Sequence, residues 1–139
     1  MEFEANAYYT TKDEFVANLA TMQETCIGVG GYLAELNTKQ EYDFVLNFLK
    51  TEVETSERGH VLLGASDDNT GNEWRYLQSG APLEWVSWKR HTSEKCMWII
   101  WNDWNDEGLH QWRCYGGNPL RPLCEIPQTG KSLKLHCQY

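Results

Sequence analysis

Cysteine is the residue type that most constrains how this chain can fold. Its 139 residues contain five cysteines, which is well above the usage of cytosolic proteins. In a small globular chain this number indicates disulfide bonds formed in an oxidising compartment, and the odd count leaves one thiol over. The residues alone leave several pairings open. Because the cysteines indicate an oxidising compartment, we expect a secreted protein. The first residues have no basic and apolar leader, so its signal peptide would have to be absent from this sequence.

Charge and composition exclude several classes of protein. The formal net charge is -8 and the pI is near 4.9, and basic residues cluster only at Lys89-Arg90, so nucleic acid is not expected as a partner. Mean hydropathy is -0.61 and no stretch approaches the roughly 20 apolar residues of a membrane span, so no membrane insertion is expected. Seven Trp and seven Tyr indicate a packed core, and the length fits one domain.

Two helices are expected in the first half of the chain and strands in the second half. Thr11 and Glu14 have the spacing of a capping box, and apolar residues at helical spacing follow them. A second capping box, Thr38 with Glu41, precedes another apolar stripe and then a polar loop at 51–59. Helices followed by short strands indicate an α+β fold. The predicted strands are 61–65, 73–77, 96–101, 111–115 and 120–125.

The order of these motifs resembles the C-type lectin-like domain family. The match runs from Tyr8 to Glu125, which is most of the chain. It implies a short-form, single-domain, invertebrate-type secreted lectin whose α+β fold has two helices, two small antiparallel sheets and a long loop. The matching segments are, in order, Cys26 with 30–36 and Glu41, 62–67, 74–80, Pro82-Leu83, Trp88, Cys96, Cys114 and Cys124-Glu125.

The resemblance also implies how the cysteines pair. Cys26–Cys124 closes a loop of about 100 residues, worth roughly 4–5 kcal/mol in the chain-entropy model, and Cys96–Cys114 closes a short loop worth roughly 3 kcal/mol. The domain then covers residues 1–127, and Cys137 is left over in a polar tail at 128–139. We expect Cys137 to form an interchain disulfide in a homodimer, which would raise avidity; the alternative is a buried or capped thiol.

The calcium–sugar motif of that family is missing from this sequence. Sugar-binding members place Glu-Pro-Asn or Gln-Pro-Asp in the long loop and Trp-Asn-Asp near the third cysteine, because Ca²⁺ takes six to eight oxygen ligands. Here the segment between Trp88 and Cys96 has no proline, and Leu109-His110-Gln111 stands in place of Trp-Asn-Asp. Calcium is therefore possible but not expected as a cofactor. Three nearby basic residues would repel a dication, although two acids of the auxiliary site remain. These residues are Lys89, Arg90 and Lys95, and Asp67 and Asp68.

A different alignment keeps a calcium site open. Trp101-Asn102-Asp103 or Trp104-Asn105-Asp106 could supply the missing motif if the strand before Cys114 carries an insertion. The other interpretation is a solvated turn with Asn/Asp chemistry, and we favour it because no partner loop faces these residues. The alternative ligand set is Asn102, Asp103, Asn105, Asp106 and Glu107.

Without a metal, protein side chains must hold a sugar directly. Arginine offers a forked donor, carboxylates accept, and histidine can do either. Trp112 or Trp104 offers an aromatic face, whereas the other strand tryptophans are expected in the core; they are Trp74, Trp88, Trp98 and Trp101. The alternative for the histidines is that they are ordinary surface residues. The predicted carbohydrate-binding residues are Arg90, His91, Glu94, Asp106, His110 and Trp112.

These patterns predict a carbohydrate-binding lectin that is independent of calcium and acts in innate recognition, with N-acetylated or galactose-type sugars as ligands. The alternative is a domain of the same fold that binds a protein partner. A third possibility, an acidic matrix or mineral-associated protein, has only the net charge in its favour. An enzyme is not expected, because no nucleophile–base arrangement, metal-ligand spacing or phosphate-binding glycine loop stands out.

Overall fold

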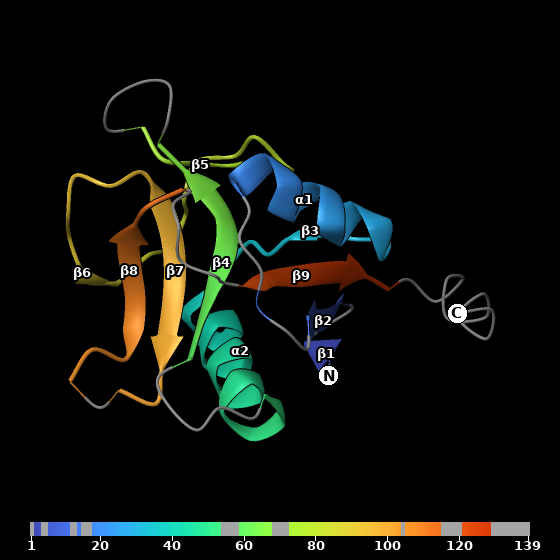
Figure 1. Cartoon of the computed structure of the whole chain (residues 1–139), viewed down its shortest axis with the longest axis horizontal. Helices are drawn as coiled ribbons and strands as arrows, with labels where there is room; N and C mark the ends of the chain where they lie inside the picture. The colour runs from blue at the N-terminus through green and yellow to red at the C-terminus, as the bar shows by residue number, and fades with distance from the viewer. Residues whose placement is uncertain are drawn as a thin grey trace.

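The structure, a computed structural model, describes residues 2–3, 6–11, 14, 18–53, 59–67, 73–103, 105–114 and 121–128. Two helices and nine strands follow one another along this part of the chain (Figure 1). The elements are β1 (Glu2–Phe3), β2 (Asn6–Thr10), α1 (Leu19–Gly28), β3 (Tyr32–Leu33), α2 (Lys39–Glu52), β4 (Gly59–Ser66), β5 (Arg75–Tyr76), β6 (Trp88–Arg90), β7 (Cys96–Trp101), β8 (Gly108–Trp112) and β9 (Arg121–Pro127).

The strands form one connected sheet in the order β1-β2-β9-β4-β7-β8-β6, with β3 beside β9 and β5 beside β4. The α+β class is therefore confirmed. One detail differs, because the two expected antiparallel sheets are joined. A short parallel pairing of β4 with β9, from Val61↔Arg121 to Leu62↔Pro122, makes this connection, and β6 also pairs with β8 in parallel.

The first helix begins later than the capping-box pattern predicts. Strand β2 pairs with β9 as far as Thr10↔Leu123, so Thr11 directly follows a strand, and neither Thr11 nor Glu14 is helical. The actual N-cap is Asn18, whose side-chain Oδ1 accepts a hydrogen bond from the Thr21 N–H at 2.9 Å. The prediction of a cap at Thr11 is wrong because tertiary strand pairing takes precedence over the local cap signal.

The second helix begins as predicted. Thr38 is its N-cap and accepts from the Glu41 N–H at 3.1 Å, while Glu41 accepts from the Asn37 N–H at 2.9 Å, one residue before the cap. The helix continues to Glu52, so the loop expected from residue 51 begins later. Thr51 stays helical and donates its hydroxyl to the Asn47 carbonyl at 2.8 Å.

Three of the five predicted strands are confirmed, and the other two differ in extent. β4, β7 and β9 match 61–65, 96–101 and 120–125, whereas the strand predicted at 73–77 shortens to β5. The strand predicted at 111–115 begins at Gly108 and ends at Trp112. The reason is its register with β7, which runs from Ile100↔Gly108 to Cys96↔Trp112 and draws the end of the polar turn into the sheet.

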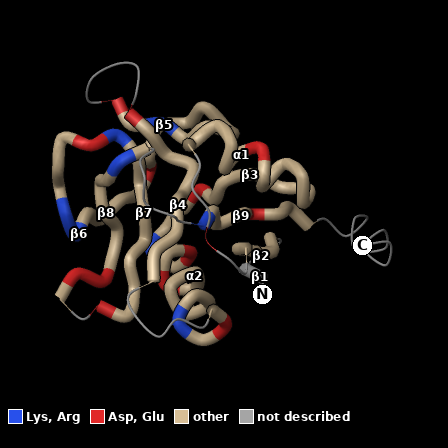
Figure 2. The backbone as a smooth tube through the Cα atoms, viewed as in Figure 1, with Lys and Arg blue, Asp and Glu red and all other residues tan. Residues whose placement is uncertain are grey.

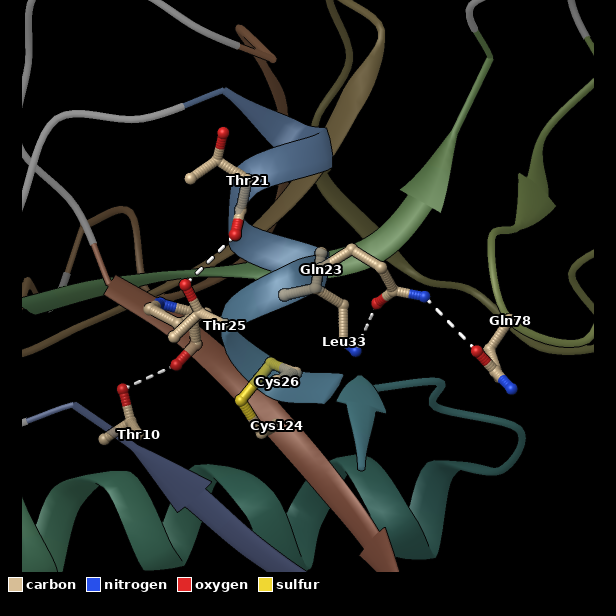
Figure 3. Close-up of a disulfide and its surroundings, with 9 residues drawn as sticks. Thr10, Thr21, Gln23, Thr25, Cys26, Leu33, Gln78 and Cys124 are labelled. Atoms are coloured by element: carbon tan, nitrogen blue, oxygen red, sulfur yellow. Dashed lines mark hydrogen bonds between the residues drawn. A yellow bond between two sulfur atoms is a disulfide. The ribbon is translucent and has the colours of Figure 1, made fainter. Parts of the chain in front are cut away.

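The two disulfides implied by the family resemblance are present. Cys26–Cys124 links α1 to β9 (Figure 3), and Cys96–Cys114 links β7 to the segment after β8. The first of these lies in a small core beneath α1, next to Leu33 of β3, whose N–H donates to Gln23 at 2.7 Å. A larger core packs α2 against the opposite face of the sheet.

Two predictions fall outside the described residues or remain untested. Cys137 and most of the predicted tail, residues 129–139, lie outside the described residues, so the interchain disulfide and the homodimer stay predictions. Among the described residues, neither helix has the length and apolar character needed to span a membrane.

Candidate binding site

A cavity of about 640 Å³ opens on the face of the sheet built by β4, β7 and β8, with β6 at its edge. Its floor is buried, and its rim is exposed or half-buried. The floor consists of Trp98, Ile100 and His110. The rim consists of Glu14, His60, Arg90, His91, Thr92, Asp106 and Trp112.

Strand alternation places the floor residues. On β7, Trp98 and Ile100 point toward the cavity, while the intervening Ile99 belongs to the core packed on α2. His110 of β8 lies opposite Trp98 in the antiparallel register, so the two meet on the same face. The floor of the cavity is therefore formed by side-chain alternation and strand register in the sheet, and not by a loop alone.

Arg90, Asp106 and His110 form the polar end of the cavity. The Arg90 Nε and Nη2 donate to Asp106 Oδ1 at 2.8 and 2.5 Å, and the Arg90 side chain is 58% exposed. His110 is only 4% exposed, and its Nε2 lies 2.5 Å from the Asp106 backbone oxygen. Because a carbonyl oxygen only accepts, Nε2 carries the proton and donates it. These contacts fix the turn before β8 to the sheet. Figure 2 shows the acidic positions of this turn and the basic positions of β6.

His60, Glu14 and two tryptophans form the opposite end. His60 Nε2 lies 3.2 Å from Glu14 Oε2, and the imidazole stacks on Trp98 with ring centroids 5.4 Å apart and an interplanar angle of 16°. Trp112 meets Trp98 edge to face at 6.3 Å, and the Arg113 guanidinium lies 5.6 Å from the centre of the Trp112 ring. This end offers aromatic and half-buried surface next to a carboxylate.

Gln111, which the favoured alignment places at the metal-binding acid of the family motif, makes hydrogen bonds. Its Oε1 accepts from the Thr92 N–H at 2.7 Å, and its backbone oxygen accepts from the Thr92 hydroxyl at 3.0 Å. Its Nε2 lies 3.4 Å from His91 Nδ1. The amide therefore ties the segment after β6 to β8 without a metal ion.

Lys95 supplies a positive charge beside Asp67, one of the two acids that the sequence comparison places near the family's auxiliary calcium site; the other, Asp68, lies outside the described residues. Asp67 is 4% exposed, and the Lys95 Nζ lies 3.7 Å from its Oδ2. The other oxygen, Oδ1, accepts from the Glu73 N–H at 2.7 Å. The Lys95 ammonium group therefore places a positive charge near the buried Asp67 carboxylate.

The alternative ligand set at 102–107 does not gather around one point in the described residues. Asp106 is paired with Arg90, and Glu107 accepts from Lys50 Nζ at 3.1 Å. Asp103 accepts from the Asn105 N–H at 3.3 Å, and Asn102 has a φ of 61°, both typical of a tight polar turn. Among the described residues, no three His, Cys, Asp or Glu side chains are grouped so that they could hold a metal ion.

Five of the six predicted carbohydrate-binding residues line the cavity, and Glu94 does not. Glu94 lies in the turn before β7, where its N–H donates to Thr92 Oγ1 at 2.9 Å, and it borders a smaller hollow beside Lys95. Trp104, the alternative stacking residue, lies outside the described residues. His110 is a floor residue, so the surface interpretation does not hold for it.

Sequence reasoning missed several lining residues and placed one of them differently. Trp98 was expected in the core; it is buried but also forms the cavity floor. His60 and Ile100 could have been found from alternation, because they lie opposite each other on β4 and β7. Glu14 could not have been found in this way, because only the folded chain brings it close to His60.

A second polar cluster is sealed between β2, β9 and the start of α2. It contains three buried carboxylates, Glu35, Glu41 and Glu125. The Tyr8 hydroxyl donates to Glu41, and the Asn6 amide donates to Glu125. Burial, and then the nearby Glu41 and Glu35, raises the pKa of Glu125 from 4.5 to about 7, against the lowering effect of hydrogen bonds from the Glu35 N–H and Asn6. Burial is also the main cause of the raised pKa of Tyr8.

The described residues form a small α+β domain with two disulfides and a cavity on its sheet. Residues 16–125 match the family model of the Lectin C-type domain, so the chain belongs to the C-type lectin domain family. Members of this family are in general binding proteins without enzymatic activity.

Individual relatives are distant. The human protein C-type lectin domain family 4 member D is 26% identical over 137 residues, which cover 91% of this chain and 57% of that protein. The chain therefore spans little more than half of the length of that relative. A calcium-independent type II antifreeze protein has a TM-score of 0.70 with 16% identity, covering 93% of this chain and 92% of that one. The C-type lectin domain of murine dendritic cell inhibitory receptor 2, in complex with an N-glycan, has a TM-score of 0.70 with 19% identity. The match covers 92% of this chain and 95% of that one.

Proposed function

We propose that this domain is a carbohydrate-binding lectin that holds its ligand without calcium in the cavity on β4, β7 and β8. The observation that carries the proposal is the convergence of five predicted binding residues, from three separate segments, around one space of about 640 Å³. A cavity of this size is within the range of small-molecule sites. The glycan complex of the murine neighbour supports carbohydrate as the ligand class.

The independence from calcium rests on what replaces the metal. The Gln111 amide holds the segment that follows β6, and the Lys95 ammonium lies beside the buried Asp67. A calcium ion in the loop would bridge segments of the chain and balance the charge of carboxylates. Because protein groups perform both tasks here, no metal is needed to order the loop. A type II antifreeze protein of the same fold is calcium-independent, which is a precedent for a domain of this fold that works without the metal.

The cavity can hold a pyranose in two ways at once. The Arg90 fork and the Asp106 carboxylate can respectively donate to and accept from neighbouring hydroxyls, as polar planar side chains commonly do. Trp112, half-buried at the rim, offers apolar surface to the C–H face of galactose or to an N-acetyl methyl group. We therefore propose galactose-type or N-acetylated sugars, bound by a secreted, non-enzymatic homodimer in innate recognition.

A glycan array run in calcium and again in EDTA tests the proposal. We expect the same glycans to bind in both buffers, and Arg90→Ala to lose at least about tenfold in affinity, equivalent to the roughly 1.5 kcal/mol of a charged hydrogen bond. The matched control is Arg75→Ala, because Arg75 is another exposed arginine paired with a carboxylate, Glu73, and lies outside the cavity. Binding only in calcium would contradict the proposal.

The alternative is a domain of the same fold that binds a protein partner. It is favoured by one observation, the replacement of the family's sugar-binding motif by His110 and Gln111, which are both engaged in internal hydrogen bonds. Failure to bind any glycan in either buffer, with the domain folded, would support this alternative.

A further inference from the structure

A second, smaller hollow of about 230 Å³ opens at the end of the β7–β8 pair. Two of its lining residues come from the turn before β7, and the other two directly follow β8. The Cys96–Cys114 disulfide ties these two segments together. The lining residues are Glu94, Lys95, Arg113 and Cys114.

Direct contacts join the walls of this hollow to the walls of the cavity. The Arg113 guanidinium of the hollow lies 5.6 Å from the centre of the Trp112 ring of the cavity. The Thr92 hydroxyl, at the cavity rim, accepts from the Glu94 N–H at 2.9 Å. The indole N–H of Trp98 donates to the Arg113 backbone oxygen at 3.0 Å, which holds the hollow in place relative to the cavity floor. The two spaces are therefore neighbours.

The hollow contains two opposite charges that are not paired with each other. Among the described residues, neither the Glu94 carboxylate nor the Arg113 guanidinium takes part in a hydrogen bond or an ion pair. Lys95, the third charged residue of the hollow, lies 3.7 Å from the buried Asp67. Because Glu94 is half-buried and Arg113 is exposed, both side chains can bind a ligand without breaking an existing pair within the described part of the chain.

A carboxylate and a guanidinium that face one small space suit an uncharged sugar ring. The carboxylate accepts from one hydroxyl, and the guanidinium fork donates to others. Since the two charges balance, the ligand needs no net charge of its own. The hollow is much smaller than the cavity, about 230 Å³ against about 640 Å³, so it offers room for one further ring beside the first.

We propose that this hollow is a second sugar subsite, so that the ligand of the domain is an oligosaccharide with one unit in the cavity and the next unit in the hollow. This inference rests on the sugar-binding function proposed for the cavity. Arg113 is the residue that sets the preference for length, because it lies against Trp112 at the boundary between the two spaces. Glu94 supplies the matching acceptor.

Calorimetric titration of the intact chain tests this inference with two pairs of probes, N-acetylglucosamine with N,N′-diacetylchitobiose, and galactose with lactose. We expect the disaccharide of the pair that binds to have about tenfold higher affinity than its monosaccharide, the effect of a hydrogen bond to a charged group. Arg113→Ala and Glu94→Ala should each reduce this ratio to below about threefold and change the monosaccharide affinity by less than about twofold. Arg75→Ala is the matched control, because Arg75 is also an exposed arginine and lies outside both spaces.

A second measurement does not depend on any variant. Saturation-transfer NMR of the bound disaccharide should show that protons of both sugar units receive saturation from the protein. Equal affinity of monosaccharide and disaccharide, saturation confined to one unit, or a ratio unchanged in both variants would overturn the second subsite while leaving the sugar site in place. Absence of binding by all four sugars would overturn the sugar site and the inference together.

Discussion

The cavity and the sealed carboxylate cluster are two polar regions that treat charge in opposite ways. In the cavity each described carboxylate lies beside a basic group, Glu14 beside His60 and Asp106 beside Arg90, at a rim that water reaches. In the sealed cluster Glu125 is surrounded by other carboxylates and tyrosines, and its charged form is disfavoured. The difference teaches that exposed pairs can exchange partners with a ligand at little cost in stability, whereas the buried cluster governs stability and its dependence on pH.

The largest expected effect on stability comes from replacing the Glu125 carboxylate of the sealed cluster by a neutral side chain. Since the pKa of Glu125 is raised from 4.5 to about 7 in the folded state, the folded protein binds more protons than the unfolded one between these values. Its contribution is therefore fully present below pH 4.5 and is lost as pH rises through 7. Glu125→Gln removes this dependence while keeping an oxygen for the Glu35 N–H, so the free energy of unfolding at pH 8 should rise by about 3 kcal/mol.

Denaturant unfolding of both proteins between pH 4 and pH 8 measures this effect. Below pH 4.5 the variant and the parent should have nearly equal free energies of unfolding, because Glu125 is then protonated in both states of the parent. A gain of the same size at pH 4 and pH 8 would show that Glu125 is not the titrating group.

The next effect in size is the loss of one buried hydrogen bond in the same cluster. Tyr8→Phe removes the hydroxyl that donates to Glu41 and leaves a buried carboxylate oxygen without this donor. We expect the free energy of unfolding to fall by about 1.5 kcal/mol, the usual worth of a hydrogen bond to a charged group. Thermal unfolding measures this loss. Affinity for glycans should stay unchanged, and a parallel loss of binding would show that the two regions are not independent.

Part of this comparison could be predicted from the sequence, and part depends on contacts that only the folded chain makes. The apolar run at 96–101 predicts strand β7, and the family resemblance implies the two disulfides and a place for His110 near a site. The pairing of Glu14 with His60, and the α1 cap at Asn18, depend on strand pairing between β2 and β9. Glu94 lies outside the lining of the cavity and borders a smaller hollow, a difference in position that residue type alone does not reveal.

A smaller effect on stability is expected at Lys95, whose ion pair is intermediate in burial between the exposed pairs of the cavity rim and the sealed carboxylate cluster. Its ammonium is about half exposed, but its partner Asp67 is buried, so Lys95→Met should reduce the free energy of unfolding by about 1 kcal/mol. Lys89→Met is the control, because Lys89 is exposed on the neighbouring strand β6. Chemical denaturation in calcium and in EDTA should give the same value for the parent protein. A parent protein stabilised by calcium would mean that Lys95 does not replace the metal.

The smallest expected effect on stability is at Asp106, and it separates the two regions most clearly. Asp106→Asn keeps the shape and the acceptor oxygen of the side chain, and it leaves the backbone oxygen that His110 uses. Because the ion pair with Arg90 is at the rim, its loss should cost no more than about 0.5 kcal/mol of stability. Asp43→Asn, which breaks the exposed pair with Lys39 on α2, should have a stability effect of similar size.

Binding should distinguish these two variants. Asp106 both orients the Arg90 fork and accepts hydroxyl hydrogens in the proposed site, so Asp106→Asn should weaken glycan affinity by about tenfold, whereas Asp43→Asn should leave it unchanged. The expected result is a large change in affinity with almost no change in stability, the reverse of Tyr8→Phe. If Asp106→Asn lowered stability by as much as Tyr8→Phe, the rim pair would be a structural element, and the proposed division of roles between the two regions would be wrong.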